Sequence, residues 1–172
     1  MSSNNKPSSS SAPATTTSAL TTQHNLSLHA AQIAAAACIK KATEIGVPMN
    51  IAIVDATLYL LHFARMPGAK LTSVDIAINK AFTAAGHRNP THVYREVVWP
   101  GGPAYGINNS NGGRFTVIGG GVPVVVDGEV VGAVGCSTGT PEQDREVAQA
   151  GVDAVVEYVR KERERERRGA KL

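Results

Sequence analysis

The dipeptide Asp127-Gly128, set between two valine-rich runs, constrains the fold more than any other feature of this chain. Residues 122–126 precede it and residues 129–137 follow it, and β-branched side chains of this kind favour strands. An Asp-Gly pair accepts the positive backbone angles of a two-residue hairpin turn. The two runs are therefore predicted to pair as an antiparallel hairpin.

A second hairpin is predicted closer to the N-terminus. Residues 49–54 read as a buried strand and residues 58–65 as another, and Asp55-Ala56-Thr57 supplies a turn between them. The short connection favours antiparallel pairing.

Serine and threonine residues mark helix starts, because their side chains can accept hydrogen bonds from the first free backbone N–H groups. The clearest is Thr140, with Pro141 at the first helical position and Gln143 at the third. The predicted helices cover residues 28–45 after Ser27, residues 72–86 with a capping box at Thr72 and Asp75, a short piece at 91–97 with Thr91 as its cap, and 141 to beyond 159.

The order of these elements sets the fold class. It is a helix, two strands, a helix, an irregular segment, about three strands and a helix. Strands joined by hairpins and flanked by helices indicate an α+β domain, with helices covering an antiparallel sheet. The chain is 42% hydrophobic but only 5% aromatic, so the core is expected to consist of Ala, Val, Ile and Leu.

The two ends differ in composition from the middle. Residues 1–24 are polar and carry Lys6 as their single charge, which predicts disorder. Residues 160–171 hold seven basic and three acidic residues in alternation, which is typical of a solvated helix end. The expected domain therefore spans residues 25–160, and a charged tail follows at residues 161–172.

Charge and hydropathy exclude several classes of partner. The net charge is +3, but the tail supplies +4 and Lys6 adds +1, so the remaining residues sum to about −2. With no interleaved basic and aromatic residues, a nucleic-acid partner is not expected. The apolar runs fall short of the roughly 20 residues that span a bilayer. Cys38 and Cys136 lie in apolar segments, which predicts buried reduced thiols and a cytoplasmic location.

Eight of the seventeen glycines fall between Pro100 and Gly121. Glycine lets a ligand or another chain approach the backbone closely, so a binding surface is expected here. The last of these glycines lead into a strand instead of a helix, which excludes the phosphate loops of Rossmann and P-loop proteins. The glycines proposed to contact a ligand are Gly101, Gly102, Gly112 and Gly113.

Several longer motifs suggest a family. In chain order they are EIGVPMNIAIVDA, LLHFARMPGAKLTSVDIAINKA, WPGGPAYGI and GGGVPVVVDGEVVGAVGCSTGTPEQD. Together they resemble the GlcG/HbpS family, which includes the C-terminal domain of PduO-type adenosyltransferases, over about residues 26–158. The resemblance implies a profilin-like α/β/α sandwich with a five-stranded antiparallel sheet that assembles into homo-oligomers. Some members of this family bind haem, so the resemblance also implies haem as a candidate ligand.

Two departures from the family pattern alter its surface. Relatives usually carry Gly-Gly where this chain has Thr57-Leu58, which changes the tightness of the hairpin. They also carry an acidic residue where this chain has Pro67. Its loss leaves the rim around Arg65 and Lys70 more positive, and better suited to an anionic ligand.

Candidate ligand-binding side chains follow from these observations. The guanidinium group of Arg65 can bind a carboxylate through two N–H groups, although an internal salt bridge is an equal alternative. Lys80 lies among alanines in the INKA stretch, where it can hold an anion, and Tyr105 flanks the Pro-Gly-Gly-Pro turn. No pair of histidines has the i, i+4 spacing of a helical metal site. The resemblance nevertheless singles out His29, because some haem-binding relatives place an axial histidine near the start of the first helix.

Two functions remain open from the sequence. In the first, the protein is a ligand-binding homo-oligomer, and a small anionic molecule or haem lies against the glycine-rich loops beside Arg65, Lys80 and Tyr105. In the second, it is a cofactor-free enzyme for a small organic acid or carbonyl compound. Its catalytic candidates are then Glu96, His92 and Tyr105, which would move a proton. A scaffold with no ligand is the third alternative.

Overall fold

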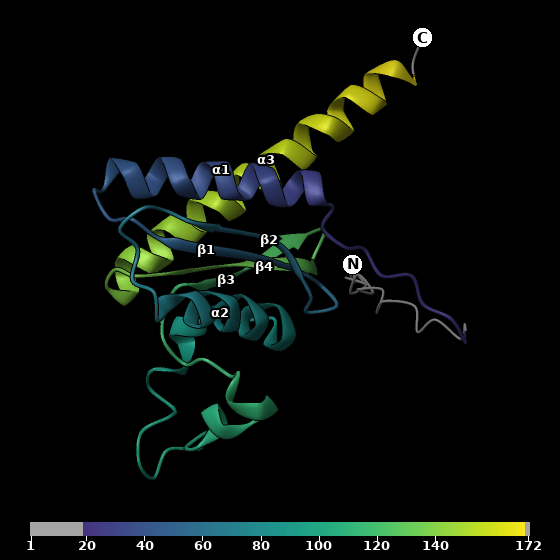
Figure 1. The fold of residues 1–172 in the computed structure, drawn as a ribbon. Coiled ribbons are helices and arrows are strands. Elements are labelled where there is room, and N and C mark those ends of the chain that lie inside the picture. Colours follow the sequence, from purple (N-terminus) through teal and green to yellow (C-terminus); the bar gives the residue numbers. More distant parts are fainter. Residues whose placement is uncertain (1–18, 171–172) are drawn as a thin grey trace, which may run out of the picture.

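Four antiparallel strands form one sheet in the order β2-β1-β4-β3 (Figure 1). The strands are β1 (Asn50–Asp55), β2 (Leu60–Arg65), β3 (Gly121–Val126) and β4 (Glu129–Ser137). The computed structural model describes residues 19–170, so most of the segment predicted to be disordered lies outside the described residues.

Helices cover both faces of the sheet. Helices α1 (Leu28–Glu44) and α3 (Pro141–Gly169) lie on one face, and α2 (Ser73–His87) lies on the other (Figure 1). The alternation along β1 explains the layering, because Ile51 and Ile53 pack in the core under α1 and α3, whereas Ala52 and Val54 pack under α2. The predicted α+β class, with helices covering an antiparallel sheet, is confirmed.

The turn at Asp127-Gly128 joins β3 to β4 as predicted. Asp127 has φ 52° and Gly128 has φ 82°, the two positive angles that this kind of turn requires. The first hairpin turns differently, because Leu58, a non-glycine residue, adopts φ 74° in its turn. Its turn is held by Asp55, whose Oδ1 accepts hydrogen bonds from the backbone N–H of Thr57 and of Tyr59. A side-chain carboxylate thus supports a backbone angle that is costly for leucine.

Two of the four predicted helix caps are confirmed. Ser27 accepts a hydrogen bond from the N–H of Ala30, and Thr140 with Gln143 forms a complete capping box. The cap predicted at Thr72 is wrong: Thr72 has helical angles and its side chain makes no capping bond. The short helix predicted at residues 91–97 is a 3₁₀ turn, η1 (Thr91–Tyr94), and the cap predicted at Thr91 is wrong, because Pro90 occupies the capping position and no side chain makes a capping bond there.

The prediction of a five-stranded sheet is also wrong, because the sheet has four strands. Between α2 and β3 the chain forms only η1 and two further 3₁₀ turns, η2 (Ile107–Asn109) and η3 (Asn111–Gly113). The apolar stretch after η3 docks on α2 instead of the sheet edge. Phe115 packs edge-on against the rings of His87 and Tyr94, and the backbone N–H of Thr116 donates to Thr83 Oγ1.

A buried ion pair joins α2 to α3 at the end of the sheet. Lys80 is only 1% exposed, and its Nζ donates to Asp144 Oδ2 at 2.7 Å and to the carbonyl of Cys136 at 3.0 Å. The other carboxylate oxygen of Asp144 accepts hydrogen bonds from the N–H groups of Thr138 and Gly139. The two charges therefore pair with each other, and each also has hydrogen-bond partners in the backbone.

Glycines make room for this pair and for α2. A Cβ on Gly120 would lie 2.8 Å from Lys80 Nζ and 2.6 Å from the Cys136 carbonyl. A Cβ on Gly135 would lie 2.1 Å from the backbone carbonyl of Ala77. Glycine is needed at Gly120 because the ion pair and the backbone of β4 fill the space that a side chain would occupy, and at Gly135 because the backbone of α2 approaches the sheet directly. Because α2 approaches so closely, the buried side chains between α2 and the sheet are mostly alanines.

Both cysteines are buried and free, as predicted. Burial raises the pKa of the Cys136 thiol well above its usual value, and a hydrogen bond with Cys38 raises it further. Because the thiolate is the reactive form, Cys136 is expected to be unreactive at neutral pH. Across residues 19–170, no helix has the length and apolar character needed to cross a membrane.

We expect Lys80→Met to destabilise the protein by about 3–5 kcal/mol, because the substitution leaves the Asp144 carboxylate buried without its cation. Chemical denaturation followed by circular dichroism measures this change. The matched control is Lys161→Met, which removes an exposed lysine that contacts Glu157 at 3.2 Å on the same helix as Asp144. The control should unfold nearly as the wild type does. Equal stability of the two variants would contradict the structural role of the buried pair.

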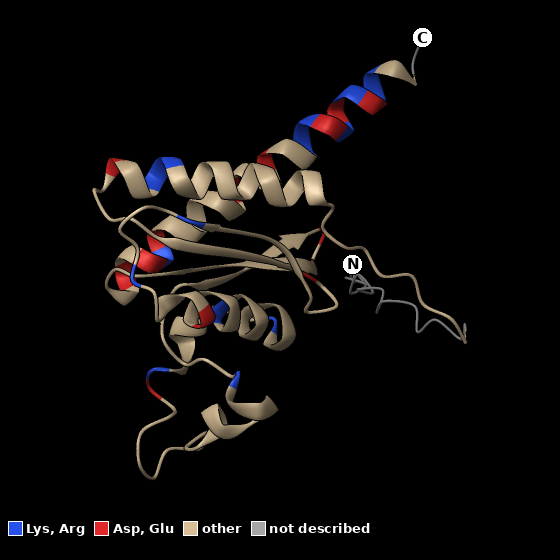
Figure 2. Cartoon of the chain, viewed as in Figure 1, with Lys and Arg blue, Asp and Glu red and all other residues tan. Residues whose placement is uncertain are grey.

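The outer end of α3 extends beyond the sheet and carries alternating basic and acidic residues (Figures 1 and 2). We propose that residues 25–160 form the folding unit. A chain of these residues should keep its melting temperature within a few degrees, because the exposed pair of Arg163 with Asp127 contributes little to stability. A large fall in the melting temperature, measured by differential scanning fluorimetry, would show that one end belongs to the folding unit.

Candidate functional site

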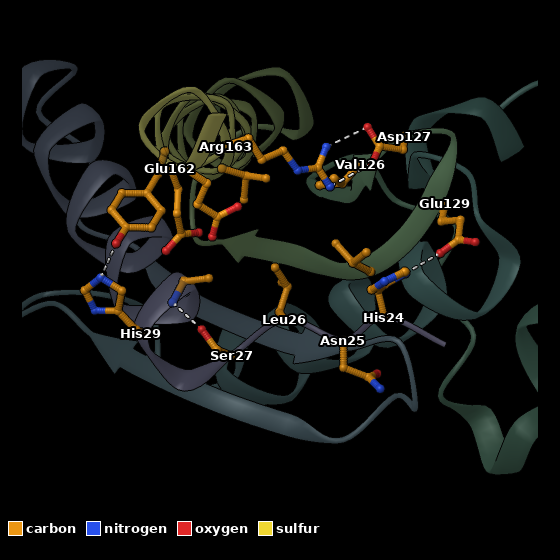
Figure 3. A pocket seen from close by; sticks show the side chains of 15 residues that line it. His24, Asn25, Leu26, Ser27, His29, Val126, Asp127, Glu129, Glu162 and Arg163 are labelled. Atoms are coloured by element: carbon orange, nitrogen blue, oxygen red, sulfur yellow. Dashed lines mark hydrogen bonds and ion pairs between the residues drawn. The ribbon is translucent and has the colours of Figure 1, made fainter. Parts of the chain in front are cut away.

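A cavity of about 450 Å³ lies between the start of α1, the outer half of α3 and the β3–β4 hairpin (Figure 3). We call it the α1–α3 pocket. Residues that define its two sides and floor include His24, Leu26, His29, Val126, Tyr158 and Arg163. Its volume is within the usual range for small-molecule sites.

His29 stands at the rim of the α1–α3 pocket in the first turn of α1. Its Nε2 lies 3.2 Å from the hydroxyl of Tyr158, a residue of α3, and the two rings meet edge-on at 5.3 Å. This contact fixes the orientation of an exposed imidazole. The ring is thus held at the mouth of the cavity by a residue that is 129 positions away in sequence.

The floor of the α1–α3 pocket is apolar. Leu26 and Val131 are both buried there, and the backbone N–H of Leu26 donates to the carbonyl of Val131 at 2.9 Å. This bond ties the chain before α1 to β4. The pocket therefore offers a hydrophobic wall beneath a polar rim.

The rim of the α1–α3 pocket carries more acidic than basic groups. The acidic residues are Asp127, Glu129, Glu162 and Glu166. Arg163 pairs with Asp127 at 2.7 Å, and His24 Nδ1 lies 2.9 Å from Glu129 Oε2 (Figure 3). The hydrogen bond from Arg163 lowers the pKa of the Asp127 carboxyl group, so this residue stays ionised. The rim is consequently anionic at neutral pH.

A second cavity, also of about 450 Å³, lies where η1 and the segment before β3 meet the start of α3. We call it the η1–α3 pocket. Its polar lining is His92, Arg95, Glu142 and Arg145. Burial lowers the pKa of His92 from its usual value, and the positive charge of Arg145 lowers it further. His92 is therefore a neutral imidazole at neutral pH.

The predicted ligand-binding residues do not gather in one place. Lys80 is enclosed by its ion pair with Asp144 instead of facing a rim, so it is not available to a ligand in this conformation. Arg65 is exposed at the end of β2, and the internal salt bridge considered for it does not form among the described residues. Tyr105 is 65% exposed on the segment that projects from the domain beside α2 (Figure 1).

The three catalytic candidates do not line a common pocket. Glu96 is exposed and approaches Arg95 at 3.7 Å. His92 lines the η1–α3 pocket, whereas Glu96 and Tyr105 do not. Within the part of the chain that the structure describes, no hydrogen bond links any two of these three residues.

The glycines of the projecting segment have two different roles. Gly101, Gly112 and Gly113 have φ values of 86°, 67° and 79°, which favour glycine. Gly102 does not have a positive φ, but a Cβ there would lie 2.6 Å from the carbonyl of Val97. The four glycines thus shape the segment itself, and their role toward a ligand stays a prediction.

Sequence reasoning missed Tyr158, Arg163 and Arg145. All three lie on α3: Tyr158 and Arg145 belong to the predicted helix that starts at residue 141, to which no site residue was assigned, and Arg163 lies in the tail that was read as a solvated helix end. Their roles depend on which side of a long helix faces the hairpin or η1, and no local motif encodes that orientation. Across residues 19–170, no group of three or more His, Cys, Asp or Glu side chains is arranged to hold a metal ion.

Comparison with known proteins places this geometry in context. The family model described as haem degrading protein HbpS-like matches residues 26–153. An uncharacterised 15.0 kDa protein of the dhaT-dhaS intergenic region of Citrobacter freundii is 43% identical over 132 residues, which cover 77% of this chain and 93% of that protein.

Two solved structures have closely similar folds. Klebsiella pneumoniae protein ORFY has a TM-score of 0.79 at 39% identity, over 82% of this chain and 97% of that one. A PduOC–haem complex has a TM-score of 0.72 at 35% identity, over 76% of this chain and 94% of that one.

Proposed function

The chain belongs to the GlcG/HbpS family, and we propose that it binds haem in the α1–α3 pocket with His29 as the axial ligand. The observation that carries this proposal is the His29 imidazole, which Tyr158 orients at the mouth of a cavity with an apolar floor. A relative that is 35% identical has been solved as a haem complex, which supports the same ligand class here.

The donor set fits haem better than it fits a bare metal ion. A bare ion needs several protein ligands, whereas haem iron is commonly held by a single proximal histidine. If the Nε2–H of His29 donates to the Tyr158 hydroxyl, the lone pair resides on Nδ1 and can bind iron. The tyrosine then acts as the second partner that fixes the tautomer of a metal-bound histidine.

The charges of the pocket determine how haem would lie. Four acidic residues against Arg163 would repel the propionates, so these groups are expected to point toward solvent while the macrocycle contacts Leu26 and Val131. When bound, haem iron would supply redox and dioxygen chemistry. The protein residues would bind and orient the group and shield one of its faces from water.

We also propose that the protein is a homo-oligomer that uses the segment containing the glycine-rich turns. Trp99 and Tyr105 are 62% and 65% exposed on this segment, which projects from the domain (Figure 1). Large exposed aromatic side chains are enriched at protein interfaces. Contact with a second copy would bury these rings and bring Gly101 and Gly102 against the partner.

Titration with hemin tests the haem proposal. We expect wild-type protein to develop a Soret band with one equivalent of hemin, and His29→Ala to weaken binding at least tenfold by loss of the axial ligand. His62→Ala is the matched control and should bind as the wild type does, because His62 lies on β2 outside the pocket. Unchanged affinity and an unchanged Soret band in His29→Ala would remove this residue as the ligand.

Light scattering tests the oligomer. At micromolar concentration the measured mass should be at least twice the 17.9 kDa of one chain. Replacing Trp99 with Ser should shift the mass toward the monomer while leaving the circular dichroism spectrum unchanged, because this side chain is exposed within one chain. A wild-type mass near 17.9 kDa would contradict the proposal.

A further inference from the structure

We propose that the η1–α3 pocket is a second, separate site that binds a small monocarboxylate with a short alkyl chain. The cavity brings together side chains from η1, from the segment before β3 and from the start of α3. It shares no lining residue with the α1–α3 pocket.

Gly119 keeps this cavity open. A Cβ at this position would lie 3.2 Å from the carbonyl oxygen of Pro141 and 3.4 Å from the Cβ of His92. Both distances are tight, so even alanine would push η1 and α3 apart or fill the space between them. Because glycine has no side chain, a space remains between η1 and the start of α3 at this point.

The ionised groups of the η1–α3 pocket leave one positive charge in excess. Arg95 and Arg145 are cationic, and Glu142 is anionic. Arg145 makes no hydrogen bond or ion pair with any residue from 19 to 170. Arg95 approaches only Glu96, at 3.7 Å with both side chains exposed, so its guanidinium is also largely available. A single carboxylate would neutralise the site.

Arg145 and the neutral His92 line the same cavity. Burial lowers the pKa of His92, and the positive charge of Arg145 lowers it further. A carboxylate between the two residues could accept hydrogen bonds from the guanidinium and from an imidazole N–H. Bonds from arginine to carboxylate are charge-assisted and frequently bidentate.

The remaining wall of the η1–α3 pocket is apolar and selects the rest of the ligand. Val117, Ile118 and Pro141 line it, and Ile118 is 49% exposed. An alkyl chain of a few carbons would cover this surface. Inorganic phosphate carries more charge and has no apolar part, so it fits the site less well than a short fatty acid does.

This site is distant from the proposed haem pocket. Arg145 and Tyr158 are thirteen positions apart on the same helix, and at 1.5 Å per residue this places their backbones about 20 Å apart. Occupation of one pocket therefore need not block the other, and the two proposals can fail independently.

Titration of ¹⁵N-labelled full-length protein with sodium butyrate at pH 7 tests the site by NMR. We expect saturable shifts at residues 117–119 and 142–145, no saturable shifts with butylamine, and weaker binding of inorganic phosphate. Arg145→Gln should reduce butyrate affinity about tenfold or more, the loss expected for one charge-assisted hydrogen bond. Arg168→Gln removes an exposed arginine further along α3 and should leave the affinity unchanged.

A second variant tests the apolar wall. Ile118→Ala should lower the affinity ratio of butyrate to acetate, because only the longer acid reaches this side chain. The proposal is overturned if butyrate binds Arg145→Gln as tightly as the wild type, or if the shifts lie outside the pocket. Competition between one equivalent of hemin and butyrate would also overturn it, since that result would assign the pocket to haem.

Discussion

The buried pair of Lys80 and Asp144 links the two helical layers of this protein. Lys80 belongs to α2 and Asp144 to α3, which cover opposite faces of the sheet, so their ion pair crosses the end of the sheet between them. The same carboxylate holds the backbone of Thr138 and Gly139, where the chain leaves β4 for α3. Burying two charges is costly, and this cost is offset only when both are fully hydrogen-bonded. The position of α3, and with it both pockets, depends on that arrangement.

Small residues explain how such a pair fits. α2 lies against the sheet through Ala77 and Ala81, with Gly135 directly opposite. Gly120 leaves space for the ammonium group of Lys80, and Gly121 leaves space for the backbone carbonyl of the same residue. The buried members of the cluster between α2 and the sheet are therefore alanines and a valine, and Phe63 packs against them only as a partly buried side chain. Phe115 and Tyr94 instead form a ring cluster with His87 at the end of α2.

Local signals predicted the parts of the fold that local interactions determine. The turn at Asp127-Gly128 and the caps at Ser27 and Thr140 depend on neighbours within a few residues, and all three were correct. Thr72 carries the same kind of signal, yet its backbone is already helical. The fifth strand was implied by the family resemblance and had no residues assigned to it, and residues 19–170 form only four strands; the segment before β3 instead packs Phe115 against rings of α2 and η1. Lys80 was correctly picked out as unusual, but its partner is 64 residues away and lies in no motif with it.

The two pockets differ in charge, and this difference argues that they serve different ligands. The α1–α3 pocket has a predominantly acidic rim over an apolar floor, so it suits a large hydrophobic group whose charges remain in solvent. The η1–α3 pocket has an excess positive charge from two guanidinium groups, so it suits a small anion that enters fully. The helix α3 supplies residues to both pockets. Its N-terminal end lies at the η1–α3 pocket, and a helix dipole favours negative charge at that end. Because α3 is anchored at Asp144, beside Arg145, the η1–α3 pocket lies close to the rigid end of the helix. The α1–α3 pocket lies further along, where Tyr158 and Arg163 are held by contacts with α1 and the β3–β4 hairpin.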